Sequence, residues 1–199
     1  MQRKRPGIRS KKFRIIGKRI YLRPLGPEDA DIVYEVIESS RKDLRKWVSF
    51  AESQDLAGTK KYLHRAAEGR KKGRHYTFGI FLKDTHEYVG NVGAFKKTDF
   101  SFELGYWMGT KHAGKGYMRE AAVNLIDILF KEFPIHRLEI RTGPENRRSQ
   151  NVPEKIGFKK EGRLRQINRF KNRWQDLYVY GLLKPEWKKS RKRLLAKYK

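Results

Sequence analysis

The order of hydrophobic and polar residues along the chain predicts several strands separated by helices. Alternating or short apolar runs, bounded by turn residues, are typical of strands. They occur at residues 20–25, 76–82, 88–95, 100–108, 136–142, 158–164 and 177–183. The segments that join the second, third and fourth of these runs are short and polar, so we expect residues 76–108 to form an antiparallel meander.

A second pattern, with apolar residues every three to four positions, predicts the helices. A proline and two acids at residues 27–29 mark the start of a helix that reaches about residue 39. Residues 41–71 have helical spacing with a break in the middle, which indicates two helices. Residues 118–133 form a strongly amphipathic pattern, and residues 149–156 predict a short helix. With 199 residues, the chain has the length of one α/β domain.

The composition excludes several classes of site. There is no cysteine, so there can be no disulfide, no thiolate zinc site and no cysteine nucleophile. The five histidines show no metal-ligand spacing, and we expect no metal. No stretch is apolar enough to cross a membrane and the basic N-terminus does not resemble a signal peptide, so we expect no membrane contact and a cytoplasmic protein.

The charge is unusually high: 48 basic minus 22 acidic residues give +26. Residues 1–19 hold nine basic residues and no acid, and residues 184–199 hold eight basic residues and one acid. We interpret residues 1–17 and 188–199 as basic arms outside a domain at 18–187, with Phe13 and Tyr198 available for stacking. Arms of this kind bind polyanions, so we expect contact with RNA or the ribosome. The alternative is two solvated ends that bind nothing specific.

One block carries most of the chemistry: FELGYWMGTKHAGKGYMREAAVNLI, residues 102–126. A strand that leads through glycines into a helix N-terminus builds an anion site, because unpaired N–H groups and the helix dipole point the same way. Residues 109–115 match the nucleotide-triphosphate loop G-x-x-x-x-G-K. The next residue is Gly116, however, where that loop needs Ser or Thr for Mg²⁺, and no suitable later strand supplies an aspartate.

A second match is better. Lys111-x-x-Gly114-x-Gly116, followed by Tyr117 and a helix, resembles the pyrophosphate loop Q/R-x-x-G-x-G/A of the GNAT family of acetyl-CoA-dependent N-acetyltransferases. PENRRSQNVPEKIGF, residues 144–158, resembles the N-x-x-S-x-x-x-x-E-K-x-G-F segment of the RimJ/RimL branch, which acetylates protein N-termini. With IYLRPLGPEDA, ELGYWMG and LLKPEW, the resemblance covers about residues 18–187.

The resemblance implies a fold and a set of binding residues. The fold is a mixed, mostly antiparallel sheet of about seven strands, flanked by helices, in which two central parallel strands, 102–108 and 137–142, splay apart around the pantetheine of acetyl-CoA. A backbone amide near Met108 would face the acetyl carbonyl, and Asn146 would bond the pantetheine. The residues assigned to acetyl-CoA are Trp107, Met108, Lys111, His112, Ala113, Gly114, Lys115, Gly116, Tyr117, Met118, Asn146 and Ser149.

The resemblance also suggests two catalytic residues. Ser149 would protonate the departing thiolate, although serine also often caps a helix that it begins. Glu103 would be the general base that takes a proton from the amine, acting through water. The alternative for Glu103 is a solvated glutamate or one paired with a neighbouring cation. Weaker candidates for the base are Glu52, Asp55 and Glu87. Two aromatic residues, Trp47 and Phe50, could line the pocket for the amine substrate, although aromatic residues at helical spacing more often belong to the core.

Three functions follow. The first is transfer of an acetyl group to a protein N-terminal α-amine, of the ribosomal-protein type, by a monomer or homodimer. The second keeps the transfer but takes a small amine such as a polyamine or an aminoglycoside, which a basic body should repel. The third is an RNA-binding protein that retains the fold without catalysis.

Overall fold

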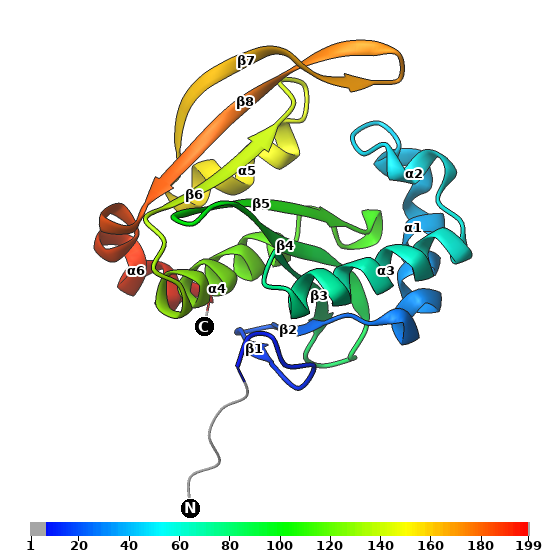
Figure 1. The fold of residues 1–199 in the computed structure, drawn as a ribbon, viewed down its shortest axis with the longest axis horizontal. Helices are drawn as coiled ribbons and strands as arrows, with labels where there is room; N and C mark the ends of the chain where they lie inside the picture. Colours follow the sequence, from blue (N-terminus) through cyan, green and yellow to red (C-terminus); the bar gives the residue numbers. More distant parts are fainter. Residues whose placement is uncertain (1–6, 199) are drawn as a thin grey trace, which may run out of the picture.

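The strands form one sheet that runs through the whole molecule (Figure 1). The computed structural model describes residues 7–198. Within them the sheet has eight strands in the order β1-β2-β3-β4-β5-β6-β8-β7, and β5 and β6 are its parallel pair. The bounds are β1 (Ile15–Ile16), β2 (Ile20–Pro24), β3 (His75–Leu82), β4 (Tyr88–Thr98), β5 (Ser101–Met108), β6 (Arg137–Thr142), β7 (Lys159–Phe170) and β8 (Arg173–Leu183). The predicted meander and the predicted fold class are confirmed, with β1 as an additional strand.

Helices cover both faces of the sheet. The bounds are η1 (Pro27–Asp29), α1 (Ala30–Leu44), α2 (Phe50–Ser53), α3 (Leu56–Lys71), η2 (Thr110–His112), α4 (Tyr117–Glu132), α5 (Arg147–Ile156) and α6 (Lys184–Tyr198). The larger core cluster joins α4, α5 and α6 to one face of the sheet, and the smaller cluster joins α1 and α3 to the other. No helix in residues 7–198 is long and apolar enough to cross a membrane.

The alternation of side chains along β5 fixes which residues meet which layer. Phe102 and Leu104 are buried in the cluster with α4, and Tyr106 packs against the same cluster. Trp107 points to the opposite face and packs with α1 and α3. The two faces of one strand therefore serve two different parts of the molecule.

The described parts of the two basic ends, residues 7–17 and α6, pack on the domain, and the prediction that Phe13 and Tyr198 are free for stacking is wrong. Residues 1–6 of the predicted N-terminal arm and Lys199 lie outside the described residues. Phe13 is 1% exposed and Tyr198 is 6% exposed, both within the larger core cluster. The backbone carbonyl of Tyr198 accepts hydrogen bonds from the Lys18 amide at 3.1 Å and the Asn124 side chain at 3.2 Å. The boundary expected between residues 187 and 188 therefore lies inside one continuous helix, α6.

The last two strands are longer than the pattern predicted. β7 and β8 form a hairpin that closes with the two residues Lys171 and Asn172, both with positive φ, as a tight hairpin turn requires. Most of β7 is exposed, so it lacks the inward apolar positions by which a strand is found in a sequence. In Figure 1 this hairpin extends above the sheet toward α2.

Candidate active site

The parallel pair β5 and β6 separates halfway along its length. Paired residues run from Ser101 with Arg137 to Leu104 with Ile140, and the pairing stops there. Beyond that point β5 continues beside β4 as far as Met108, and β6 continues beside β8 as far as Thr142. The backbone edges that face each other beyond Leu104 are free for a ligand, which fits the predicted site for pantetheine.

The glycine loop stands at the end of β5 and leads into α4. Gly114 and Gly116 have φ values of +82° and +84°, which glycine adopts without strain. Gly116 is the N-cap of α4, and no side chain caps the helix. A side chain at Gly114 would meet no atom within 4 Å, so the space in front of the loop is open. The loop therefore offers free N–H groups at the positive end of a helix dipole, as an anion such as pyrophosphate requires.

The other predicted loop residues hold the loop in place. His112 is buried, and its Nε2 lies 3.0 Å from Oε1 of Glu87, which Lys111 also contacts at 3.2 Å. Burial works to raise the pKa of Glu87, but the hydrogen bonds from these two residues outweigh it and the net shift is downward. Ala113 ends η2, Met118 is buried, and Tyr117 begins α4. Glu87 thus supports the loop and does not line the acceptor cavity described below.

Arg19 is a loop contact that the sequence patterns did not reveal. Its guanidinium lies 4.7 Å from the centre of the Tyr117 ring and donates to the backbone carbonyl of Lys115 at 3.0 Å. It also donates to the buried carboxylate of Glu120 at 2.9 Å. These contacts tie the start of β2 to the first turn of α4, although the two segments are a hundred residues apart.

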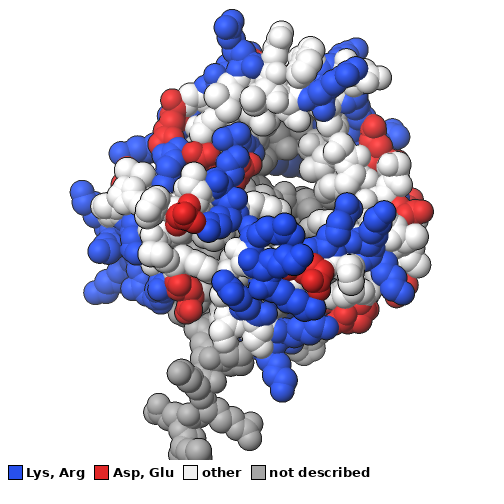
Figure 2. Space-filling view, in the orientation of Figure 1, with Lys and Arg blue, Asp and Glu red and all other residues white. Residues whose placement is uncertain are grey.

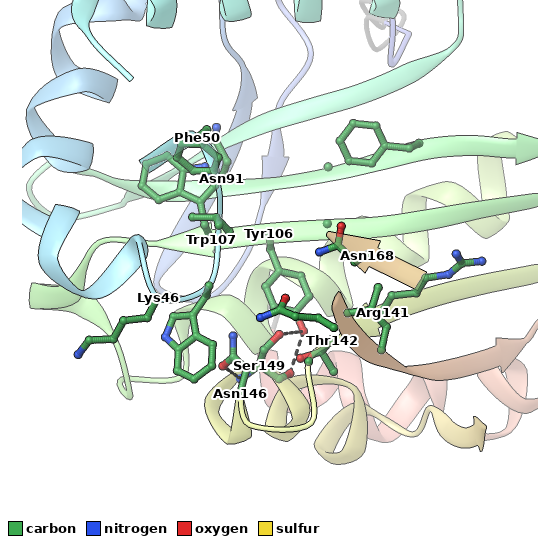
Figure 3. A pocket seen from close by; sticks show the side chains of 18 of the residues that line it. Lys46, Phe50, Asn91, Tyr106, Trp107, Arg141, Thr142, Asn146, Ser149 and Asn168 are labelled. Atoms are coloured by element: carbon green, nitrogen blue, oxygen red, sulfur yellow. Dashed lines mark hydrogen bonds between the residues drawn. The ribbon is translucent and has the colours of Figure 1, made fainter. Parts of the chain in front are cut away.

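Asn146, Ser149 and Tyr106 form a hydrogen-bonded group where β5 and β6 separate (Figure 3). The Oδ1 atom of Asn146 accepts from the Ser149 amide at 3.0 Å, so Asn146 is the N-cap of α5 and Ser149 is not. The Tyr106 hydroxyl donates to the Ser149 carbonyl at 2.9 Å, and the Ser149 hydroxyl lies 3.3 Å from it. Burial raises the pKa of Tyr106 well above its usual range, so this phenol keeps its proton. Tyr106 was missed because one tyrosine in an apolar strand looks like a core residue.

Glu103 lies on β5 with its carboxylate between two cations. Its Oε2 is 3.2 Å from Nζ of Lys97 and 3.5 Å from Nε of Arg141. Arg141 lines the cavity and Glu103 does not, so the carboxylate is one side chain removed from it. The ion-paired alternative of the sequence analysis describes its contacts, and its catalytic role stays a prediction.

The remaining base candidates are also engaged. Glu52 pairs with Lys171 at 2.8 Å, and Asp55 caps α3 by accepting from the Gly58 amide at 2.7 Å. Two carboxylates do line the cavity, Glu145 and Asp176. Asp176 accepts from the Gln166 amide and from Arg163, and these bonds lower its pKa. Glu145 has no cation within 4.0 Å among residues 7–198.

A cavity of about 810 Å³ opens on the α1–α3 face of the sheet and reaches Tyr106, Asn146 and Ser149. Figure 2 shows this face hollowed between the hairpin and the lower half of the molecule. The lining comes from α1, α2, α3, the central strands, the start of α5 and both strands of the β7–β8 hairpin. The tip of the hairpin contacts α2 through the Lys171–Glu52 ion pair, which joins two sides of the cavity.

Aromatic side chains make up much of the cavity wall. Trp47 is 43% exposed and lines the cavity, so the interpretation of this residue as core is wrong. Phe50 lines it too and packs on Trp107, with 5.9 Å between ring centres. On the floor, Gly93 of β4 is paired with Gly105 of β5, and the absence of side chains there makes room for a ligand. No group of three His, Asp or Glu residues in the described chain is placed to hold a metal.

Comparisons with known proteins agree with this geometry. The family model described as "Acetyltransferase (GNAT) domain" matches residues 19–159. The chain is 32% identical to "Probable N-acetyltransferase YjcK" of Bacillus subtilis over 85% of this chain and 97% of that protein. It is 29% identical to the "[Ribosomal protein uS5]-alanine N-acetyltransferase" of Escherichia coli over 90% and 95% of the two chains. A crystal structure of a "Probable acetyltransferase" has a TM-score of 0.80 and 28% identity, covering 85% of this chain and 96% of its own.

The fold alone extends to more distant structures. RimJ of Mycobacterium smegmatis in complex with CoA-disulfide superposes with a TM-score of 0.81 at 22% identity, covering 89% and 88% of the two chains. Sheet topology, the separated parallel pair, the glycine loop and the sequence match all point to one family. The chain belongs to the GNAT family and is an N-acetyltransferase that takes its acetyl group from acetyl-CoA.

Proposed function

We propose that this enzyme acetylates the α-amine at the N-terminus of a protein. The observation that carries the proposal is the cavity, which opens to the surface beside α2 and the hairpin and reaches the Tyr106–Ser149 pair at its inner end. A chain end can enter such a cavity while the rest of the protein stays outside. The relative named "[Ribosomal protein uS5]-alanine N-acetyltransferase" supports a protein as the acceptor.

The chemistry of the amine also favours an α-amine. Transfer needs the neutral form, and with an ordinary pKa of about 7.7–8.0 roughly a tenth of an α-amine is neutral at pH 7. A lysine with a pKa of about 10.4 is neutral in only about 0.04% of molecules at that pH. An α-amine therefore needs much less help from a base.

Most charged side chains in the cavity lining are compensated by ion pairs. The cationic side chains in its lining are Lys46, Arg65, Arg141 and Arg163, and the acids are Glu145 and Asp176. Arg163 neutralises Asp176 at 2.5 Å. Lys46 and Arg141 pair with Asp43 and Glu103 beside the lining. Among the lining residues this leaves Arg65 without an acidic partner and Glu145 without a cation, so the charges alone do not select the acceptor.

In the proposed reaction the neutral amine attacks the acetyl carbonyl, the C–S bond breaks, and CoA leaves as a thiolate. Ser149 would give the thiolate a proton and take one back from water, while Tyr106, which donates its own proton to the Ser149 carbonyl, would hold the serine hydroxyl in place. Glu103 would accept the proton of the amine through water, with Arg141 between it and the cavity. The amides after Gly114 would hold the pyrophosphate.

A screen of acetyl-CoA turnover tests the acceptor class. The acceptors are peptides with a free N-terminus, N-blocked lysine peptides, spermidine and an aminoglycoside, at equal concentration. We expect turnover on the free N-termini to exceed the others by about tenfold or more. Faster turnover of the small amines would reject the proposal and leave the family assignment intact.

We further propose that the basic ends contact RNA, as their charge suggests. Figure 2 shows Lys and Arg gathered on the left of the molecule, where α6 lies. The exposed cations of α6 are Lys188, Lys189, Lys192, Arg193 and Lys197. Since Leu194 and Tyr198 are buried, the test is charge removal: replacing Lys188, Lys189 and Lys192 with Gln should flatten the salt dependence of RNA binding by roughly one unit of log–log slope for each phosphate that is no longer neutralised. An unchanged slope would reject this interaction.

A further inference from the structure

Three buried polar side chains line the cavity with an atom that has no hydrogen-bond partner among residues 7–198: Thr142 at the end of β6, and Thr77 and Asn91 on the neighbouring strands β3 and β4. Thr77 on β3 is 4% exposed and Asn91 on β4 is 3% exposed, and both line the cavity. The hydroxyl of Thr77 and the Nδ2 amide of Asn91 have no hydrogen-bond partner among residues 7–198. Buried polar groups in native proteins nearly always have partners, so two orphans at one cavity wall point to a ligand.

The orientation of the Asn91 amide is fixed from the other side. The Tyr88 hydroxyl donates to Oδ1 of Asn91 at 2.8 Å. Tyr88 itself is buried among aromatic rings, with ring centres 5.5 Å from Phe81 and 6.1 Å from Trp107. With its oxygen already used, Asn91 presents its N–H groups to the cavity and acts there as a donor.

Helix α3 contributes two more hydrogen-bond donors to the cavity wall, Tyr62 and Arg65. The Tyr62 hydroxyl interacts with the side chains of Thr77 and Asn91, and burial raises its pKa so that it keeps its proton. Arg65 lies one turn further along α3 and also lines the cavity. No acidic side chain in residues 7–198 lies within 4.0 Å of its guanidinium, unlike Lys46, Arg141 and Arg163, which all have acidic partners.

The donors of this cluster do not belong to the acetyl-CoA site. The glycine loop at 114–116 that fits pyrophosphate contributes no residue to the cavity lining. Thr77, Asn91, Tyr62 and Arg65 lie instead on the face covered by α1 and α3. A negatively charged group that meets them must therefore arrive with the acceptor.

We propose that Asn91, Thr77, Tyr62 and Arg65 form a subsite for a carboxylate of the acceptor, so that the enzyme selects chain ends with an acidic side chain near the α-amine. A carboxylate accepts about four hydrogen bonds, which matches amide, hydroxyl, phenol and guanidinium donors. Arg65, the lining cation without an acidic partner among residues 7–198, favours the same choice. This inference rests on the proposed N-terminal acceptor and names its preferred chemistry.

The first test uses peptides that differ at one residue. A set beginning with serine carries Glu, Gln or Lys at position 2, 3 or 4, with every other residue constant. At the best position we expect kcat/KM for Glu to exceed Gln about tenfold and Lys about a hundredfold, with most of the difference in KM. Equal values for Glu and Gln would overturn the carboxylate assignment, because charge would then play no part.

The second test uses mutations to change the preference for glutamate over glutamine in the peptide. Arg65→Gln should reduce the Glu-over-Gln ratio to about one, and Arg65→Lys should keep part of it. Asn91→Asp keeps the shape but replaces donors with a negative charge, and should reverse the preference in favour of Lys. Lys60→Gln is the matched control, because Lys60 is exposed on the same helix and does not line the cavity. CoA affinity and the thermal midpoint check that each variant is folded.

The outcomes separate this inference from the proposed function. If no peptide N-terminus is acetylated, both fail. If all peptides are acetylated equally well, the proposed function stands and the subsite is wrong. A Glu preference that survives Arg65→Gln and Asn91→Asp unchanged would also overturn the subsite.

Discussion

The donor side and the acceptor side of this active site are built in different ways. On the donor side, the free edges of β5 and β6 and the loop at Gly114 and Gly116 offer backbone groups. On the acceptor side, side chains from helices, strands and the hairpin surround a floor of two glycines. A backbone site binds the same ligand whatever side chains surround it, whereas a side-chain site changes its specificity with single substitutions. Relatives of one fold can therefore share acetyl-CoA and differ in acceptor.

The largest effect should come from removing residues 188–199. α6 packs on α4, the helix that carries the glycine loop, through Leu194 and Tyr198 and through an ion pair at 2.5 Å between Arg191 and the buried Asp127. Losing two large buried side chains costs about 5 kcal/mol or more, which corresponds to a drop in Tm of roughly 10 °C or more. Calorimetric melting of the full-length protein and of the protein without residues 188–199 measures this difference in Tm. Equal Tm values would mean that α6 does not support the donor side.

The next effect concerns the base. Glu103→Gln should lower kcat by about 10²–10⁴ at neutral pH, and much of the loss should return as the pH rises, because the amine then loses its proton unaided. Glu145→Gln is the companion variant, since Glu145 lines the cavity and has no cation nearby. A pH–rate profile for each variant decides between them. If Glu103→Gln keeps the wild-type profile and Glu145→Gln loses activity, the base belongs to the acceptor side.

A smaller effect should be confined to the donor side. Gly116→Val places a β-branched side chain at a φ of +84°, which strains the loop and brings its Cβ to about 3.4 Å from Arg19. We expect the KM for acetyl-CoA to rise about 10- to 100-fold while the KM for the peptide stays constant. Gly162→Val is the control, because a side chain there meets no atom within 4 Å and the φ of Gly162 is not positive. A change in peptide KM would show that the two sides are coupled.

The smallest effect should be confined to the acceptor side. Lys171→Ala removes the exposed ion pair between the hairpin tip and Glu52 of α2. Exposed pairs contribute about 0–1 kcal/mol, so we expect the peptide KM to rise no more than about fivefold, with the acetyl-CoA KM unchanged. Steady-state kinetics with each substrate varied in turn provides the measurement. A rise in the acetyl-CoA KM would contradict the separation of the two sides.

The difference between a donor side built from backbone groups and an acceptor side built from scattered side chains also explains which parts of the site the sequence could predict. The glycines of the loop and the Asn146–Ser149 motif are contiguous and chemically distinctive, so the donor side could be located. Thr77, Asn91 and Arg65 come from separate elements, and each is an ordinary polar residue in its own segment. Only the fold brings them to one cavity, and no local pattern shows it.

Two elements were misjudged for related reasons. In α6 the residues that pack inward, Trp187, Leu194 and Tyr198, recur at helical spacing, but abundant lysine and arginine favoured a free arm. In α5 the pattern predicts a helix that begins at Ser149, whereas the Asn146 side chain caps it three residues earlier. Asparagine is as good an N-cap as serine, so the signal was present in the sequence.

The central claim is that acetyl-CoA acetylates a chain end through the cavity. The most direct measurement is mass spectrometry of one peptide that carries a free α-amine and an internal lysine, after incubation with enzyme and acetyl-CoA. The account predicts a single acetyl group on the α-amine, and no product when the N-terminus is blocked. Acetylation of the lysine, or of a blocked peptide at the same rate, would contradict it.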